Sequence, residues 1–174
     1  MSTPNHELRV RLRSVTEPVV ERLGYELVAV EVYGGTSRKI LVRLTIDRTG
    51  GVGIADCARV SRAVSPVLDV EDVVVSAYEL EVSSPGTEPP LQREKEWKRF
   101  FGCLARARLF GMESRRWIRG RIGPCADGMA VIETSEGPRS FAIADVDRAN
   151  VELNAEQFER MGQGLPPVSE GETP

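Results

Sequence analysis

The sequence has little of the residue types on which metal sites and many catalytic sites depend. It contains one histidine, His6, and three widely spaced cysteines, Cys57, Cys103 and Cys125. So few and so scattered ligands fit neither a zinc site nor a disulfide framework. A histidine-dependent triad lacks its partners near the amino terminus. We therefore expect the cysteines to be buried as small apolar residues, and the protein to need no metal or cofactor.

Long apolar runs are also missing. No segment approaches the roughly 20 residues that a membrane-spanning helix needs, and the first residues are polar rather than typical of a secretory signal. Hydrophobic residues make up 41% and charged residues 28% of the chain, which is ordinary globular composition. These features predict a cytoplasmic protein without a membrane contact, and we expect it to act as a monomer.

Lysine is scarce, with three lysines beside twenty arginines, and charge is unevenly distributed. Residues 92–124 hold ten basic and three acidic side chains, a net charge of +7, whereas residues 125–174 hold three and ten, a net charge of -7. Residues 1–91 carry the remaining -3. A basic segment within an acidic chain predicts a localised contact with nucleic acid. The acidic remainder suits a basic protein partner.

The first half of the chain predicts an α-β-β-α-β order. A helical spacing of apolar residues runs from Leu8 to Leu23, and alternation over residues 25–33 and 39–47 indicates two strands joined as a hairpin. A second apolar stripe over residues 54–68 predicts a helix, and residues 78–82 alternate again. This order implies a three-stranded sheet with two helices on one face.

The segment 84–90, rich in proline and glycine, marks a domain boundary. We predict an N-terminal α/β domain at residues 1–91, of which 87–91 form an interdomain spacer. Five short strand candidates follow, at residues 103–110, 116–122, 129–133, 139–143 and 150–153. They predict a small C-terminal β-barrel at residues 92–153 and an overall α+β fold. Residues 154–174 are expected to form a flexible tail.

The basic segment supplies the candidate ribonucleic acid contacts. Two-residue spacing places Arg106 and Arg108 on one strand face, and Trp117, Arg119 and Arg121 on one face of the next strand. Arginines beside an aromatic ring suit phosphate contact and base stacking. A solvated barrel exterior with Trp117 partly in the core explains the same pattern equally well.

Two further features have a plain interpretation beside a functional one. The turn Gly50–Gly53 leads into a helix and could hold a phosphate, but it lacks the residues of a nucleotide-binding loop. The acidic residues Asp69, Glu71 and Asp72 could bind a divalent ion. We favour an ordinary turn for Gly50–Gly53 and a solvated loop for the acidic residues.

One stretch resembles a known family. Residues 78–86, Tyr-Glu-Leu-Glu-Val-Ser-Ser-Pro-Gly, closely resemble the signature of the bacterial ribosome maturation factor RimP family. The resemblance runs from about residue 8 to about residue 153 and is strongest from Asp47 to Gly86. The family usually continues with Leu-Asp-Arg-Pro-Leu. Here residues 87–91 read Thr-Glu-Pro-Pro-Leu, so the acid is retained in type at Glu88 and the arginine is missing.

The resemblance implies a non-catalytic factor with an Sm- or SH3-like second domain. Such a factor binds the free or immature small (30S) ribosomal subunit, near the small-subunit rRNA and a basic ribosomal protein beside the decoding centre. The signature turn, Ser83, Ser84, Pro85 and Gly86, either positions the interdomain hinge or contacts the ribosome. Two alternatives stay open: a stand-alone Sm-like RNA-binding regulator, and a metal-dependent RNA-processing enzyme that uses Asp69, Glu71 and Asp72.

Overall fold

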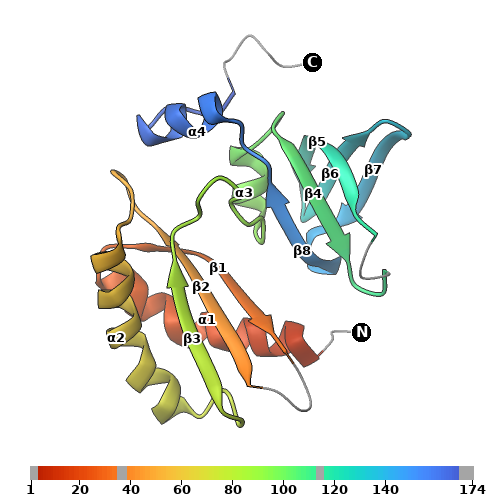
Figure 1. Ribbon diagram of the computed structural model, residues 1–174. Coiled ribbons are helices and arrows are strands. Elements are labelled where there is room, and N and C mark those ends of the chain that lie inside the picture. Colours follow the sequence, from red (N-terminus) through yellow and green to blue (C-terminus); the bar gives the residue numbers. More distant parts are fainter. Residues whose placement is uncertain (1–3, 35–38, 113–115, 169–174) are drawn as a thin grey trace. The chain divides into compact units, whose positions relative to one another are not determined.

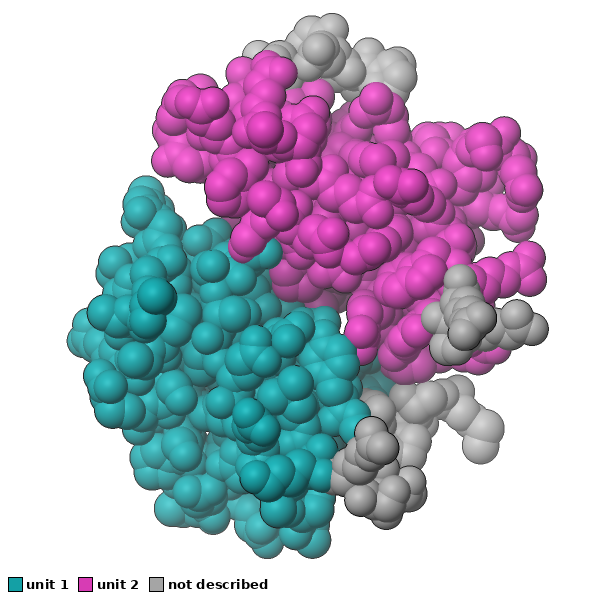
Figure 2. Space-filling model, in the orientation of Figure 1, with its two compact units in different colours: residues 1–85 teal, residues 86–174 magenta. Residues whose placement is uncertain are grey.

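The computed structural model describes residues 4–34, 39–112 and 116–168. It divides the chain into two compact units, residues 1–85 and 86–174 (Figures 1 and 2). The division falls between Pro85 and Gly86, inside the signature turn, rather than after Leu91. In the described part of the chain, no helix is both long enough and apolar enough to cross a membrane.

The first unit has the predicted α-β-β-α-β order. Helix α1 (Pro4–Arg22) precedes the antiparallel strands β1 (Glu26–Tyr33) and β2 (Ile40–Asp47), and helix α2 (Ile54–Glu71) leads to β3 (Tyr78–Ser83), which pairs parallel to β2. The sheet order is β1-β2-β3, and both helices cover one face (Figure 1). Alternate strand residues such as Val42, Leu44 and Ile46 pack with Leu12 and Val64 into a single core.

A β-bulge in β1 is held by a side chain from α1. The pairing register shifts between Leu27 and Ala29, which leaves carbonyl groups outside the regular ladder. The Arg13 guanidinium donates to the carbonyl oxygens of Leu27 and Val28, at 3.0 Å each. Glu17 accepts from the same guanidinium at 3.1 Å, so the first helix and the first strand are tied by charge-assisted hydrogen bonds.

The second unit contains the five expected strands, with shifted ends. Helix α3 (Glu94–Arg99) is followed by β4 (Leu104–Leu109), β5 (Ile118–Ala126), β6 (Met129–Thr134), β7 (Gly137–Ala142), a short 3-10 turn at Ile143–Asp145 and β8 (Val146–Val151). All neighbouring strands are antiparallel, in the order β7-β6-β5-β4-β8. Trp97 of α3 is fully buried and packs edge-to-face on Phe141, with ring centroids 5.6 Å apart.

The predicted closed barrel is wrong, because the described strands form an open sheet with β7 and β8 at its two ends. The segment 87–91 explains the open edge. The amide of Val151 donates to the Pro89 carbonyl and the Leu91 amide donates to the Ala149 carbonyl, both at 2.9 Å. These residues therefore occupy the edge of β8 that closure by β7 would need.

Two segments differ from their expected roles. Residues 87–91 were expected to be a spacer, yet Leu91 is buried in the core of the second unit and Pro90 bridges to Asn150. Residues 154–174 were expected to be a flexible tail, yet they begin with helix α4 (Ala155–Gly162). Asn154 caps this helix, because its side chain accepts a hydrogen bond from the Gln157 amide at 2.8 Å. This cap stabilises a helix in a segment whose residues are mostly polar.

Candidate functional site: the arginine face of the second sheet

The predicted basic residues lie together on one face of the second sheet. In β4, Ala105 and Ala107 are fully buried, so Arg106 and Arg108 project from the opposite face. The β4–β5 register places Arg119 directly opposite Arg106 and Arg121 opposite Leu104. We call this face, with Arg106, Arg108, Trp117, Arg119 and Arg121, the arginine face.

Trp117 joins this face from just outside a strand. It was expected within a strand, but β5 begins one residue later, at Ile118. The guanidinium carbons of Arg106 and Arg108 each lie 5.4 Å from the centroid of the Trp117 ring. Both distances fall in the range of cation–π contacts. The ring therefore holds the two guanidinium groups in place, and Trp117 is half-buried as a result.

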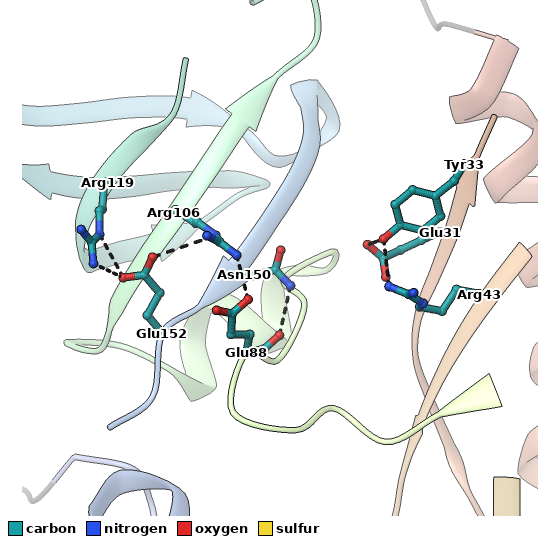
Figure 3. Close-up of polar contacts among 8 residues, drawn as sticks. All are labelled: Glu31, Tyr33, Arg43, Glu88, Arg106, Arg119, Asn150 and Glu152. Carbon is teal, nitrogen blue, oxygen red and sulfur yellow. Dashed lines mark hydrogen bonds and ion pairs between the residues drawn. The ribbon is translucent and has the colours of Figure 1, made fainter. Parts of the chain in front are cut away.

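Acidic side chains surround these arginines, which the sequence did not reveal. Glu88 accepts from Arg106 Nη2 at 2.7 Å, and Asp147 accepts from Arg108 Nε at 3.0 Å. The Oε2 atom of Glu152 accepts from Arg119 Nη2 at 2.6 Å and from its Nε at 2.9 Å (Figure 3). Arg121 is the exception, because its Nη1 donates to the Gly102 carbonyl oxygen at 2.9 Å. Each of these four arginines therefore already has a partner within the second unit.

The positions of these acids in the sequence explain why the net charge of each segment did not predict the ion pairs. Asp147 and Glu152 belong to the segment of net charge -7, and the antiparallel pairing of β8 with β4 brings them beside the +7 segment. Glu88 is the acid of the signature region, and its backbone carbonyl accepts from Asn150 Nδ2 at 3.0 Å. In the sequence these acids are only two carboxylates five positions apart, Asp147 and Glu152, a spacing that does not by itself predict their place beside the arginines.

The signature turn lies at the junction of the two units. Ser83 is the last residue of β3, and Ser84 and Gly86 are exposed. Gly86 has a φ of +61°, in the left-handed region that favours glycine. A role in the hinge and a role in ribosome contact are both still predictions.

The glycine-rich turn before α2 is closed by the protein's own carboxylate. The Oδ2 atom of Asp56 accepts from the Gly53 amide at 2.9 Å and from Arg48 Nη2 at 3.1 Å, and its Oδ1 accepts from the Tyr25 hydroxyl at 2.5 Å. The hydrogen bond from Tyr25, reinforced by the Gly53 amide, lowers the pKa of Asp56. The helix N-terminus is thus already capped by an anion, which favours the interpretation as an ordinary turn.

The acidic residues Asp69 and Glu71 lie in the last turn of α2 rather than in a loop after it, and Asp69 makes a structural contact. The Tyr78 hydroxyl donates to Asp69 Oδ1 at 2.7 Å, and Asp72 ends the helix in the left-handed conformation, with a φ of +45°. Within the ranges that the structure describes, no group of three or more His, Cys, Asp or Glu side chains is arranged to hold a metal ion. Of the three cysteines that were expected to be buried, Cys103 is fully buried, and burial raises the pKa of its thiol to about 11. Cys57 and Cys125 are partly exposed.

The helix-free face of the first sheet carries one more polar cluster. The Arg43 guanidinium donates to Glu81 Oε1 and Oε2 at 3.0 and 3.1 Å, and to the Tyr33 hydroxyl at 3.3 Å. The Tyr33 hydroxyl in turn donates to Glu31 Oε1 at 2.9 Å (Figure 3). Two carboxylates around one guanidinium leave this cluster net negative, in contrast to the arginine face.

Together, these units define a two-part α+β protein whose second sheet presents a cationic face without a catalytic constellation among the described side chains. Residues 15–88 match the family model described as the RimP N-terminal domain. This part of the chain is therefore a RimP N-terminal domain, and the family that the signature indicated is confirmed. RimP proteins are non-catalytic ribosome maturation factors, which agrees with the expected absence of enzymatic activity.

Proposed function

We propose that this protein binds the free or immature small (30S) ribosomal subunit and assists its assembly by binding rather than catalysis. The match of residues 15–88 to the RimP N-terminal domain is the observation that carries this proposal. Ribosome assembly takes place in the bacterial cytoplasm, and we propose that the protein acts there as a monomer.

The arginine face supports a contact with the small-subunit rRNA. Arginine is suited to phosphate because its planar fork donates two parallel hydrogen bonds. The neighbouring Trp117 ring holds the guanidinium groups of Arg106 and Arg108 in place for such contacts. The acidic cluster around Glu31 and Glu81 suits a basic ribosomal protein near the decoding centre, so each unit would supply one kind of contact.

Co-sedimentation tests the proposal directly. The protein should pellet with free small subunits and far less with assembled ribosomes, in which the assembly surfaces are already occupied. Equal pelleting with both particles, or with neither, would argue against the proposal. In a host that carries the gene, its deletion should raise the amounts of precursor small-subunit rRNA and of unjoined small subunits.

A further inference from the structure

Two arginines of like charge face each other across neighbouring strands. The register pairs Arg106 of β4 with Arg119 of β5, and like charges directly opposite each other destabilise a sheet. An anion placed between them removes this repulsion. In the structure the anion is Glu152, which follows β8 and has a side chain only 18% exposed (Figure 3). We call the space between the two guanidinium groups the anion seat.

Glu152 fills the anion seat unevenly. Its Oε2 accepts from both Nε and Nη2 of Arg119, at 2.9 and 2.6 Å. Its Oε1 lies 4.0 Å from Arg106 Nε, which is too far for a hydrogen bond. That Arg106 Nε is shielded from solvent and has no hydrogen-bond partner among the described residues. One buried donor beside the seat is therefore unsatisfied, which is costly for the unbound protein.

A phosphodiester is chemically suited to this arrangement. Its two non-bridging oxygens share one negative charge, so one oxygen can accept from Arg119 while the other accepts from the unsatisfied Arg106 Nε. The Trp117 ring contacts the guanidinium groups of both Arg106 and Arg108. It lies beside the anion seat and fixes the orientation of the Arg106 guanidinium group. A single-stranded RNA can thus place a phosphate in the seat and a base near the ring.

We propose that the anion seat between Arg106 and Arg119 is a phosphodiester-binding site that Glu152 occupies in the unbound protein, and that RNA binds by displacing this carboxylate. The identification of the ligand as RNA rests on the proposed function. Because Glu152 is tethered, it competes at an effective concentration of about millimolar or above. An isolated phosphate therefore competes poorly, whereas an RNA that also engages Arg108 gains enough contacts to displace it.

The test compares neutralisation of two carboxylates in the same unit. Glu152→Gln keeps the side-chain shape and removes the charge from the seat. Glu136→Gln is the matched control, since Glu136 is exposed and pairs with Arg139, at 3.4 Å, rather than with an arginine of the seat. Binding of a 12-nucleotide oligouridylate is measured by fluorescence anisotropy over a series of potassium chloride concentrations.

E152Q should bind the oligonucleotide roughly 1.5- to fivefold more tightly than the wild type, the range that loss of a partly exposed ion pair gives. E136Q should bind like the wild type. If both variants gain equally, only net charge matters and the anion seat is overturned. The gain from E152Q must also disappear when Arg119 is replaced by alanine, because the seat then lacks its better-placed donor.

A second pair of variants keeps the test decisive if E152Q lowers the melting temperature. Arg119→Ala, at a side chain 64% exposed, should weaken binding and flatten the dependence of log affinity on log salt by about 0.7. Arg139→Ala, at a side chain 58% exposed, should do neither. Equal effects of the two variants would refute the seat.

The seat and the proposed function can fail separately. If E152Q gains affinity for the oligonucleotide while the wild type does not pellet with free small subunits, the phosphodiester site stands and the proposed function fails. If the wild type pellets with free subunits but E152Q shows no gain in affinity over E136Q, the proposed function stands and the phosphodiester site fails.

Discussion

Replacing Arg106, Arg108, Arg119 and Arg121 together by alanine tests whether the arginine face attaches the protein to the small subunit. Each phosphate contact contributes about 0.7 to 0.9 to the slope of log affinity against log salt. The four guanidinium groups carry +4, and the three carboxylates of Glu88, Asp147 and Glu152 that pair with them carry -3. The net charge of the set is therefore +1.

This net charge gives two possible changes in the salt slope for the quadruple variant. If the carboxylates stay in place when RNA binds, the quadruple variant should flatten the salt slope by about 1, because only the net charge is neutralised. If RNA displaces them, as proposed for Glu152, each arginine makes its own contact and the slope should flatten by about 3. We expect the larger value.

The assay is co-sedimentation with free small subunits across a range of potassium chloride concentrations. A matched control replaces four exposed arginines of the first unit, Arg11, Arg22, Arg59 and Arg62, and changes the net charge by the same amount. Loss of three partly exposed ion pairs should lower the free energy of unfolding by about 1 to 3 kcal/mol, so the variant should stay folded. An unchanged slope, or an equal change in the control variant, would refute a role for the arginine face and leave the acidic surfaces as the docking site.

Three further predictions concern stability. Gly120→Ala should lower the free energy of unfolding in urea by about 1 to 3 kcal/mol, because its Cβ would lie 2.0 Å from the Glu133 carbonyl oxygen; Gly162→Ala, which meets nothing within 4 Å, should not. Trp97→Ala should cost about 3 to 5 kcal/mol in the same assay because it empties the second core, and a loss below about 1 kcal/mol would contradict that packing. The lowered pKa of Asp56 predicts a stabilisation that is complete above its usual value of 3.8 and is lost as pH falls through the lowered value. Thermal melts of wild type and D56N should therefore converge at acid pH, and a constant gap would contradict this linkage.

The first unit could be predicted from the sequence because local pattern and tertiary role agree there. Val42, Leu44 and Ile46 alternate along a strand that is covered on one face, so period two marks the core directly. The same holds for the stripe of α2, in which Val60, Val64 and Leu68 are buried. The hairpin of β1 and β2 is confirmed by its antiparallel register.

The second unit could be predicted less completely because its edges are fixed by contacts between distant segments. Pro89 and Pro90 have the composition of a stiff spacer, and nothing local shows that their carbonyls and neighbours pair with β8. Proline is tolerated at a sheet edge because its missing amide faces outward there. Strand spacing and the family resemblance both predict barrel closure, and neither shows that residues 89–91 take the place of the closing strand.

The candidate site shows the same division between local and distant information. Strand periodicity was sufficient to group Arg106 with Arg108 and Arg119 with Arg121, because residues two apart share a face. It could not show that Arg106 and Arg119 are opposite each other, nor that Glu152 lies between them, since both depend on register.

Charge segregation along a chain therefore differs from charge segregation in space. The +7 and -7 segments of this protein become neighbours when β8 pairs with β4, and most of the resulting face is neutralised by internal ion pairs. Such a face attracts RNA less from a distance than four free arginines would, because long-range attraction follows net charge. If RNA displaces the carboxylates as proposed for Glu152, an RNA with phosphates at the right spacing would replace each carboxylate in turn. Under this proposal the face would favour RNA of a particular shape over RNA in general, which is the selectivity that an assembly factor needs among many RNA molecules.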